Sequence, residues 1–351
     1  MARFLFVVPP LTSHVIRAAA IADELVRRGH EVTWAGYEAA IGHVLPPGAD
    51  LIALDGPGDA AARDHLLARS RAVRGVEGVR FLWGEFFAPL ARAMLAGVEA
   101  AIAASRPDLV VADQMTLAGA LAARRTRSRW ATLAPTGDVR QSLRRWPVLM
   151  AWIDTLLAEV QREADLAPVP HGEVSPLLVL ALTTPLLAGP DAVYPPQTAF
   201  VGPTLGPRAG EAPFPFDELA PGRRVLVSLG TMAAEREERF YAALKRALAD
   251  APCQVIVSAR PELRPWPGNF LVRDWLPQLA LLPLVDAVVS HGGYNTVCEA
   301  LAFGRPLVVL PIRDDQPALA ERVVALGAGL RLPFARPRPA ALATAVGRVL
   351  E

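Results

Sequence analysis

Residues suited to binding an anion gather near position 300. The segment SHGGYNTVCEALAFGRPLVVLPIRDDQ, residues 290–316, starts where an apolar run ends. His291, Gly292 and Gly293 follow that run, and a helical pattern begins near Asn295. Two glycines leave the backbone open to a ligand, and a helix N-terminus carries unpaired N–H groups with a partial positive charge. The stretch therefore suits a phosphate group.

Thr296 and Glu299 allow a second interpretation of this helix start. Their spacing is that of a capping box, in which both side chains satisfy the first N–H groups of a helix. A capping box does not need His291, nor the pair Asp315 and Gln316 at the end of the next apolar run. With a diphosphate on the helix N-terminus, Glu299 can accept from ribose hydroxyls, and Asp315 with Gln316 can bind sugar hydroxyls. The whole set predicts a nucleotide-sugar site.

A histidine and an aspartate near the N-terminus form a second candidate group. His14 follows the apolar run RFLFVVPP, and Asp113 ends the run LVVAD. Alone, His14 would be an ordinary polar residue at a helix start, and Asp113 an ordinary helix cap. On neighbouring strands, a carboxylate can fix the tautomer of an imidazole and stabilise its protonated form. Such an imidazole can take the proton of a hydroxyl nucleophile near pH 7.

Both halves of the chain alternate apolar runs with helical patterns, which predicts parallel sheets covered by helices on both faces. The runs include RFLFVVPP, HEVTWAG, PDLVVAD and RWATLAP, then RVLVSLG, CQVIVSA, DAVVS and PLVVLP. Residues 203–222 contain five prolines and three glycines, which predicts a linker. We expect two doubly wound, Rossmann-like α/β domains, residues 1–202 and 223–351. They should face each other across a cleft that collects the polar strand ends.

Composition narrows the class of protein. A chain of 351 residues can form two domains, and 36 basic against 35 acidic residues give no net field to attract nucleic acid. The only cysteines, Cys253 and Cys298, lack metal-ligand spacing and fit a reducing compartment, so we expect a cytoplasmic protein. Pro9 and Pro10 interrupt the first apolar run, which therefore predicts a buried strand rather than a signal peptide. No membrane-spanning segment is expected.

The sequence resembles the family-1, UDP-dependent glycosyltransferases, which have the GT-B fold. The resemblance is carried by WLPQ at residues 275–278 together with the 290–316 segment. It implies that Trp275 stacks on uracil and that Gln278 hydrogen-bonds the base or the ribose. The other positions that match the family are Thr231, His291, Gly293, Asn295 and Thr296 near the diphosphate, Glu299 at the ribose, Asp315 and Gln316 at the sugar, and His14 with Asp113 as the general base and its acidic partner.

The resemblance implies an inverting transfer without a metal or other cofactor. A hydroxyl activated by His14 would attack the anomeric carbon, while the helix N-terminus and His291 stabilise the departing diphosphate. Asp314 and Asp315 are adjacent acids that project differently, so a metal site is not expected. The segments PPLTSHV and VADQMTLAGAL resemble bacterial zeaxanthin glucosyltransferases. This branch implies UDP-glucose as the donor and a hydrophobic, hydroxylated acceptor such as a carotenoid.

Other interpretations stay open at this point. The acceptor could be a flavonoid, a macrolide or another natural product. A nucleotide-sugar epimerase or hydrolase would need carboxylates at the sugar rather than the His14–Asp113 pair, and a non-catalytic binding subunit would fit a tail that ends at Glu351 after one helical segment. Seven arginines within 124–145 would suit transient contact with an anionic membrane surface, although a solvated loop is the commoner explanation. The sequence predicts no oligomeric state.

Overall fold

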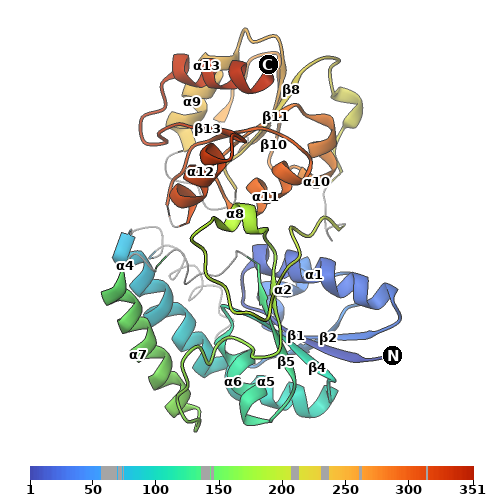
Figure 1. Cartoon of the computed structure of the whole chain (residues 1–351). Coiled ribbons are helices and arrows are strands. Elements are labelled where there is room, and N and C mark those ends of the chain that lie inside the picture. The colour runs from blue at the N-terminus through green and yellow to red at the C-terminus, as the bar shows by residue number, and fades with distance from the viewer. Residues whose placement is uncertain are drawn as a thin grey trace. The chain divides into compact units, whose positions relative to one another are not determined.

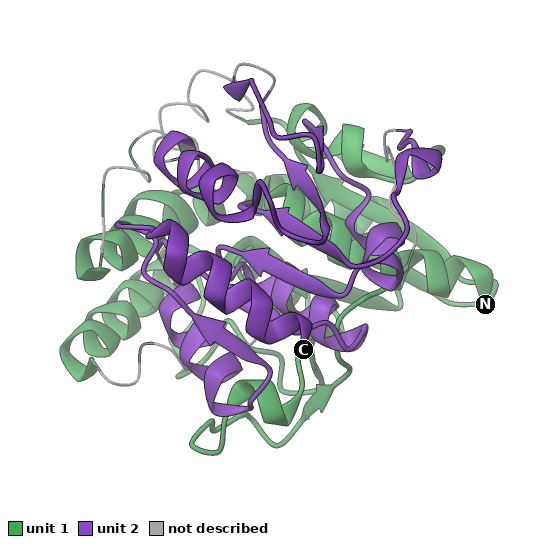
Figure 2. Ribbon diagram, turned by 90° about the horizontal axis from the view of Figure 1, so that it is seen from above, with its two compact units in different colours: residues 1–210 green, residues 211–351 purple. Residues whose placement is uncertain are grey.

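The computed structural model divides the chain into two compact units, residues 1–210 and 211–351 (Figure 2). The boundary falls inside the expected linker, in which Phe216–Glu218 form a single 3-10 turn. The described residues are 1–56, 69, 73, 75–135, 143, 146–206, 213–230, 237–260, 263–313 and 315–351. Thr231 and Asp314 therefore lie outside the described residues. That the two domains face each other across a cleft stays a prediction.

The first unit is built on a seven-stranded sheet in the order β3-β2-β1-β4-β5-β6-β7 (Figure 1). Every neighbouring pair is parallel, as the apolar runs predicted. The strands are β1 Arg3–Val7, β2 Glu31–Gly36, β3 Asp50–Ala53, β4 Leu109–Asp113, β5 Trp130–Ala134, β6 Val179–Ala181 and β7 Thr198–Phe200. The helices are α1 Thr12–Arg27, α2 Glu38–Ile41, α4 Gly75–Arg80, α5 Ala88–Ser105, α6 Leu117–Arg125, α7 Pro147–Glu163 and α8 Pro185–Ala188, with a 3-10 turn at Gly42–Val44 and a π-helix, η2, at Phe81–Phe87.

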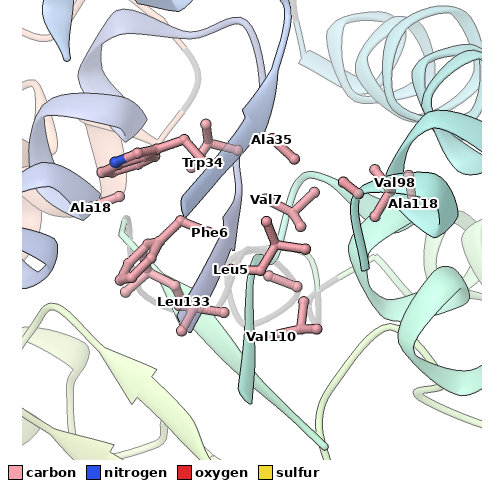
Figure 3. Packing of buried hydrophobic residues seen from close by; sticks show 14 of the residues in the cluster. Leu5, Phe6, Val7, Ala18, Trp34, Ala35, Val98, Val110, Ala118 and Leu133 are labelled. Atoms are coloured by element: carbon pink, nitrogen blue, oxygen red, sulfur yellow. The ribbon is translucent and has the colours of Figure 1, made fainter. Parts of the chain in front are cut away.

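The core of the first unit surrounds β1, whose side chains alternate between the two faces of the sheet (Figure 3). Phe6 packs beside Trp34, with ring centroids 5.0 Å apart, on the face that also holds Ala18 of α1. Leu5 and Val7 point to the opposite face, toward the helices of the α5–α6 side (Figure 3). Because both faces of β1 are buried, the strand ends rather than its faces are available for function.

One long helix in the first unit extends further than the sequence predicted. The helical pattern in the sequence extends only from about Ala91 to Ser105, whereas α4, η2 and α5 run continuously over Gly75–Ser105. By length and composition alone it could cross a membrane, and it is the one such helix in the described part of the chain. Met94 and Val98 are nevertheless fully buried in the core around β1, as in an ordinary core helix.

The arginine-rich stretch begins inside α6 rather than in a solvated loop. Arg124 donates through Nη1 to Gln161 Oε1 of α7 at 2.6 Å, and Arg125 Nε lies 2.6 Å from Glu99 Oε1 of α5. These two side chains tie three helices together, so the loop interpretation is wrong for them and they are engaged within the protein. Arg140, Arg144 and Arg145 lie outside the described residues, and contact of the stretch with a membrane stays a prediction.

The second unit contains a six-stranded, all-parallel sheet in the order β10-β9-β8-β11-β12-β13. This is a second doubly wound α/β unit, as predicted. The strands are β8 Arg224–Ser228, β9 Gln254–Ser258, β10 Phe270–Arg273, β11 Ala287–Ser290, β12 Leu307–Val309 and β13 Gly329–Arg331. The helices are α9 Glu237–Leu248, α10 Gln278–Leu281, α11 Tyr294–Ala302, α12 Gln316–Ala325 and α13 Pro339–Leu350, with a 3-10 turn at Leu282–Leu284.

Candidate functional site

The first unit brings His14 and Asp113 together at the carboxyl edge of its sheet. The adjacent strands β1 and β4 are parallel, so the start of α1 and the end of β4 meet at one edge. His14 Nδ1 lies 2.8 Å from Asp113 Oδ2, and both residues are buried. The other carboxylate oxygen, Oδ1, accepts from Met115 N at 2.9 Å. Asp113 is thus held by the turn that follows it and in turn orients the imidazole.

This geometry assigns different states to the two nitrogens of His14. A carboxylate can only accept, so the nitrogen facing Asp113, Nδ1, carries the proton and Nε2 is the basic atom. No described residue bonds Nε2, and it is not among the fully enclosed polar atoms. The interpretation of Asp113 as a helix cap is wrong, because α6 begins at Leu117 with Thr116 in the N-cap position. The pair is therefore built as a base with its orienting acid.

The second unit places a glycine loop between β11 and α11. Gly292 has φ +84°, and a Cβ on it would lie 2.7 Å from Val309 Cγ1. A Cβ on Gly293 would lie 2.5 Å from His291 Nε2, and one on Gly230, at the end of β8, would lie 2.7 Å from His291 Cε1. The His291 ring is therefore packed against two glycine backbones, which leave no space for a larger side chain.

Helix α11 begins at Tyr294, and its N-cap residue, Gly293, has no side chain that could cap it. Its N-cap is Gly293, so Thr296 lies inside the first turn instead of preceding it. Thr296 Oγ1 donates to Gln278 Oε1 at 3.3 Å. The capping-box interpretation of Thr296 and Glu299 is therefore wrong. A helix N-terminus directly after a glycine loop is a favourable position for an anion, as the sequence suggested.

The pKa of His291 is lowered from its ordinary 6.5 to about 4, mainly by burial; a hydrogen bond with the Ser228 backbone opposes the shift, and the positive charge of Arg313 adds a smaller lowering effect. The ring is thus neutral near pH 7. Arg313 is itself buried, on the connection between β12 and α12. Sequence reasoning missed both Arg313 and Gly230, although an arginine directly before Asp314 and Asp315 at a strand end could have been noticed as a further phosphate-binding candidate.

Acid should destabilise the protein through His291. Its folded-state pKa lies below the unfolded value, so the unfolded chain binds more protons between about pH 6.5 and 4. This effect leaves the free energy of unfolding unchanged above pH 6.5. As the pH falls toward 4, it lowers the free energy of unfolding by up to about 3 kcal/mol. Urea unfolding of wild type and His291→Asn across this range should show a smaller acid loss in the variant. Equal pH slopes would contradict this assignment.

Trp275, Gln278 and Glu299 are the residues predicted to bind the base and the ribose. Trp275 lies in the connection between β10 and α10 and is 41% exposed, which suits an aromatic ring on which a base can stack. Gln278 Nε2 donates to Glu299 Oε2 at 2.6 Å, and Glu299 is only 1% exposed. The amide of Gln278 therefore bonds one oxygen of the carboxylate that was predicted to accept from a ribose. A ribose hydroxyl must share or replace that hydrogen bond.

Asp315 and Gln316 lie beside the glycine loop, at the start of α12. Strands β11 and β12 are paired, so their carboxyl ends are neighbours. Gln316 Oε1 accepts from Ile312 N at 2.8 Å and from Arg313 N at 3.0 Å, and Asp315 is the N-cap residue of α12. The structure thus gathers the predicted donor residues of the second unit at one sheet edge, apart from Thr231. The roles predicted for them stay predictions.

Two parallel-sheet α/β units are the architecture of the GT-B glycosyltransferases, and comparison with known proteins identifies the class. The structure of the glycotransferase of kitacinnamycin superposes with a TM-score of 0.79 at 26% identity, covering 100% of this chain and 91% of that one. The family model "UDP-glucoronosyl and UDP-glucosyl transferase" matches residues 220–351. The chain belongs to this family of glycosyltransferases.

Relatives along most of the chain are glycosyltransferases of natural products. The demethyllactenocin mycarosyltransferase of Streptomyces fradiae is 30% identical over 94% of this chain and 75% of its own length. The 4'-demethylrebeccamycin synthase of Lentzea aerocolonigenes is 29% identical over 100% of this chain and 92% of its own length. The zeaxanthin glucosyltransferase of Pantoea ananas is 26% identical over 94% of this chain and 84% of its own length. The resemblance to the family is thereby confirmed, and the particular substrates are not.

Proposed function

We propose that this glycosyltransferase moves glucose from UDP-glucose to a hydroxyl of a hydrophobic natural product, with inversion at the anomeric carbon. The observation that carries the proposal is the 2.8 Å hydrogen bond between His14 Nδ1 and Asp113 Oδ2, which leaves Nε2 as an available base. An acceptor hydroxyl is a weak nucleophile until its proton is removed. A neutral imidazole held in one tautomer by a carboxylate supplies that function.

In the proposed reaction the acceptor oxygen forms a bond to the anomeric carbon as the bond from that carbon to the diphosphate oxygen breaks. The hydroxyl proton moves to His14 Nε2, and Asp113 stabilises the resulting imidazolium. Negative charge grows on the leaving diphosphate, which lies on the N-terminus of α11, near His291 and Arg313. These groups supply positive potential and donors, so the mechanism uses no metal ion.

The donor base and sugar are proposed from the second unit. Trp275 stacks on the pyrimidine, Glu299 with Gln278 binds the ribose, and Asp315 with Gln316 binds the sugar. An indole platform does not by itself separate uracil from thymine, because both present a flat π-face. The donor test below therefore includes both nucleotides. UDP-glucose is the donor named first, because the family description covers UDP-glucosyl transfer.

The acceptor is proposed to be a carotenoid such as zeaxanthin or, as the second candidate, a flavonoid, a macrolide or another natural product. The second candidate is favoured by identity, since the mycarosyltransferase is 30% identical to this chain and the zeaxanthin enzyme 26%. Both classes offer a hydroxyl on a large apolar body.

A direct assay tests the proposal. The purified chain is incubated with UDP-glucose or dTDP-glucose and with a hydroxylated carotenoid, a macrolide aglycone or a flavonoid, and products are identified by mass spectrometry. We expect a mass increase of one hexosyl group on at least one acceptor and acceptor-dependent release of nucleoside diphosphate. Release that is equally fast without any acceptor would indicate a hydrolase, and conversion of the donor into an isomer would indicate an epimerase. Donor binding without any reaction would indicate a non-catalytic subunit.

A further inference from the structure

Three exposed arginines lie at the amino edge of the sheet in the first unit. Arg106 follows α5 just before β4, Arg127 follows α6, and Arg129 directly precedes β5. Strands β4 and β5 are paired, and α5 packs against α6 (Figure 1), so the three residues lie at the same edge. The backbone of Arg129 is fixed there, since its carbonyl accepts from Val110 N at 2.9 Å. We call Arg106, Arg127 and Arg129 the arginine edge.

The positive charge of the arginine edge is not neutralised within the described part of the chain. None of its three side chains forms a hydrogen bond or an ion pair with a described residue. Neighbouring arginines do, because Arg3 Nε lies 3.8 Å from Asp108 Oδ2 and Arg125 Nε lies 2.6 Å from Glu99 Oε1. Basic and acidic residues nearly balance in the whole chain, 36 against 35, yet this edge carries a local positive potential.

Two of the three arginines have a backbone conformation that favours glycine. Arg106, with φ 45°, and Arg127, with φ 54°, lie in the left-handed region, where the Cβ of an L-residue comes too close to the following carbonyl oxygen. Helices commonly end with a glycine in this conformation. Arg127 is not needed for the dipole of α6, since Arg124 and Arg125 already lie in its last turn. The chain thus keeps arginine where glycine would be less strained, which indicates a use for these side chains.

An exposed leucine lies on the same edge. Leu177 is two residues before β6, the strand that pairs with β5, and it is 53% exposed. Thr132 N of β5 donates to Leu178 O at 2.9 Å, which holds this connection beside β5. The edge therefore presents an apolar side chain on the strand next to the one that Arg129 precedes.

We propose that the arginine edge and Leu177 bind the surface of an anionic lipid bilayer. A guanidinium group can bond a lipid phosphate through two N–H groups, and a leucine side chain can enter the boundary between headgroups and acyl chains. A nucleic acid would use the charges without the leucine. His14 lies at the opposite, carboxyl edge of the sheet, so this contact does not cover the candidate base. The inference goes beyond the proposed function and does not depend on it.

The double substitution Arg106→Gly with Arg127→Gly tests the proposal. Glycine suits both backbone conformations, so the variant should melt at the wild-type temperature or higher. Binding is measured by sedimentation with vesicles of equal parts phosphatidylcholine and phosphatidylglycerol. Each arginine near an anionic surface contributes about fivefold to partitioning, so the variant should need about 25-fold more lipid for half-maximal binding. Salt should release the wild type, and vesicles of phosphatidylcholine alone should not bind it.

The double substitution Arg246→Gln with Arg348→Gln is the matched control. These exposed arginines lie in α9 and α13 of the second unit, so the control loses the same two charges elsewhere. It should bind anionic vesicles as the wild type does. An equal loss in the control would show that net charge alone matters and would overturn the inference. Unchanged binding in the glycine variant, no binding by the wild type, or a lower melting temperature of the glycine variant would also overturn it.

The variant Leu177→Ser separates a bilayer from an acidic macromolecule. It keeps every arginine, so a polyglutamate resin should retain it as it retains the wild type. Its binding to anionic vesicles should weaken about fivefold, because a partly exposed apolar side chain no longer leaves water. Vesicle binding equal to that of the wild type would overturn the bilayer assignment in favour of an acidic protein or a nucleic acid. Failure of the proposed function would change none of these results, since the measurements contain no donor or acceptor.

Discussion

His14→Ala should lower the rate of glycosyl transfer by about 10²–10⁴-fold and leave donor binding unchanged. The reason is that Nε2 of His14 is the basic atom of a histidine whose other nitrogen is bound to Asp113 at 2.8 Å. Alanine removes the base and leaves the residues of the second unit's candidate donor site unchanged. Steady-state kinetics with saturating acceptor give the rate, and calorimetry with UDP gives the donor affinity.

Asp113→Asn is the matched control for this prediction. An asparagine can still accept from Met115 N through its Oδ1, as Asp113 does at 2.9 Å, so the turn is preserved. Its NH₂ group would then face Nδ1 of His14 and favour the tautomer with the proton on Nε2. This variant should fold, keep its imidazole and still transfer slowly. Wild-type rates in either variant, or a parallel loss of UDP affinity, would contradict a base role.

The strand ends of the site could be predicted from the sequence, because an apolar strand pattern stops there and a polar residue follows it. RFLFVVPP, LVVAD and DAVVS contain buried parallel strands. A polar residue directly after such a strand lies at the carboxyl edge of the sheet. The pairing of His14 with Asp113 followed from this topology. In contrast, the capping-box spacing gave no warning that α11 begins at Tyr294, because the glycine before it serves as the N-cap residue.

Contacts between segments distant in sequence could not be predicted in the same way. Gly230 packs on His291, and Gln278 bonds Glu299, only because β8, β11 and the start of α10 come together in the folded unit. The extension of one helix through Phe81–Phe87 was also missed. Its aromatic residues weaken a helical prediction, and a π-helix has its own periodicity. Local pattern fixes element type, whereas these contacts depend on tertiary packing.

Gly293→Ala should reduce kcat/KM for the nucleotide-sugar donor by about 100-fold. The backbone at Gly293 has φ −60° and ψ 137°, which alanine adopts without strain. The added methyl carbon would lie 2.5 Å from His291 Nε2, so the ring must move. Gly230 also lies close to that ring, since a Cβ added there would be 2.7 Å from Cε1. A displacement of about 1 Å of a positioning group can cost about 100-fold in rate.

Gly347→Ala provides the matched control, since nothing lies within 4 Å of a Cβ added at this position of α13. It should leave donor kinetics unchanged and stabilise the fold by about 0.5–1 kcal/mol, the usual gain for alanine over glycine within a helix. Donor kinetics, UDP affinity and melting temperature are measured for both variants. Unchanged donor kinetics in Gly293→Ala would show that the position of His291 does not matter to the donor. A large loss in both variants would show that the effect is not specific to the glycine loop. Loss in Gly293→Ala alone would link His291, through its packing against two glycines, to the diphosphate end of the donor.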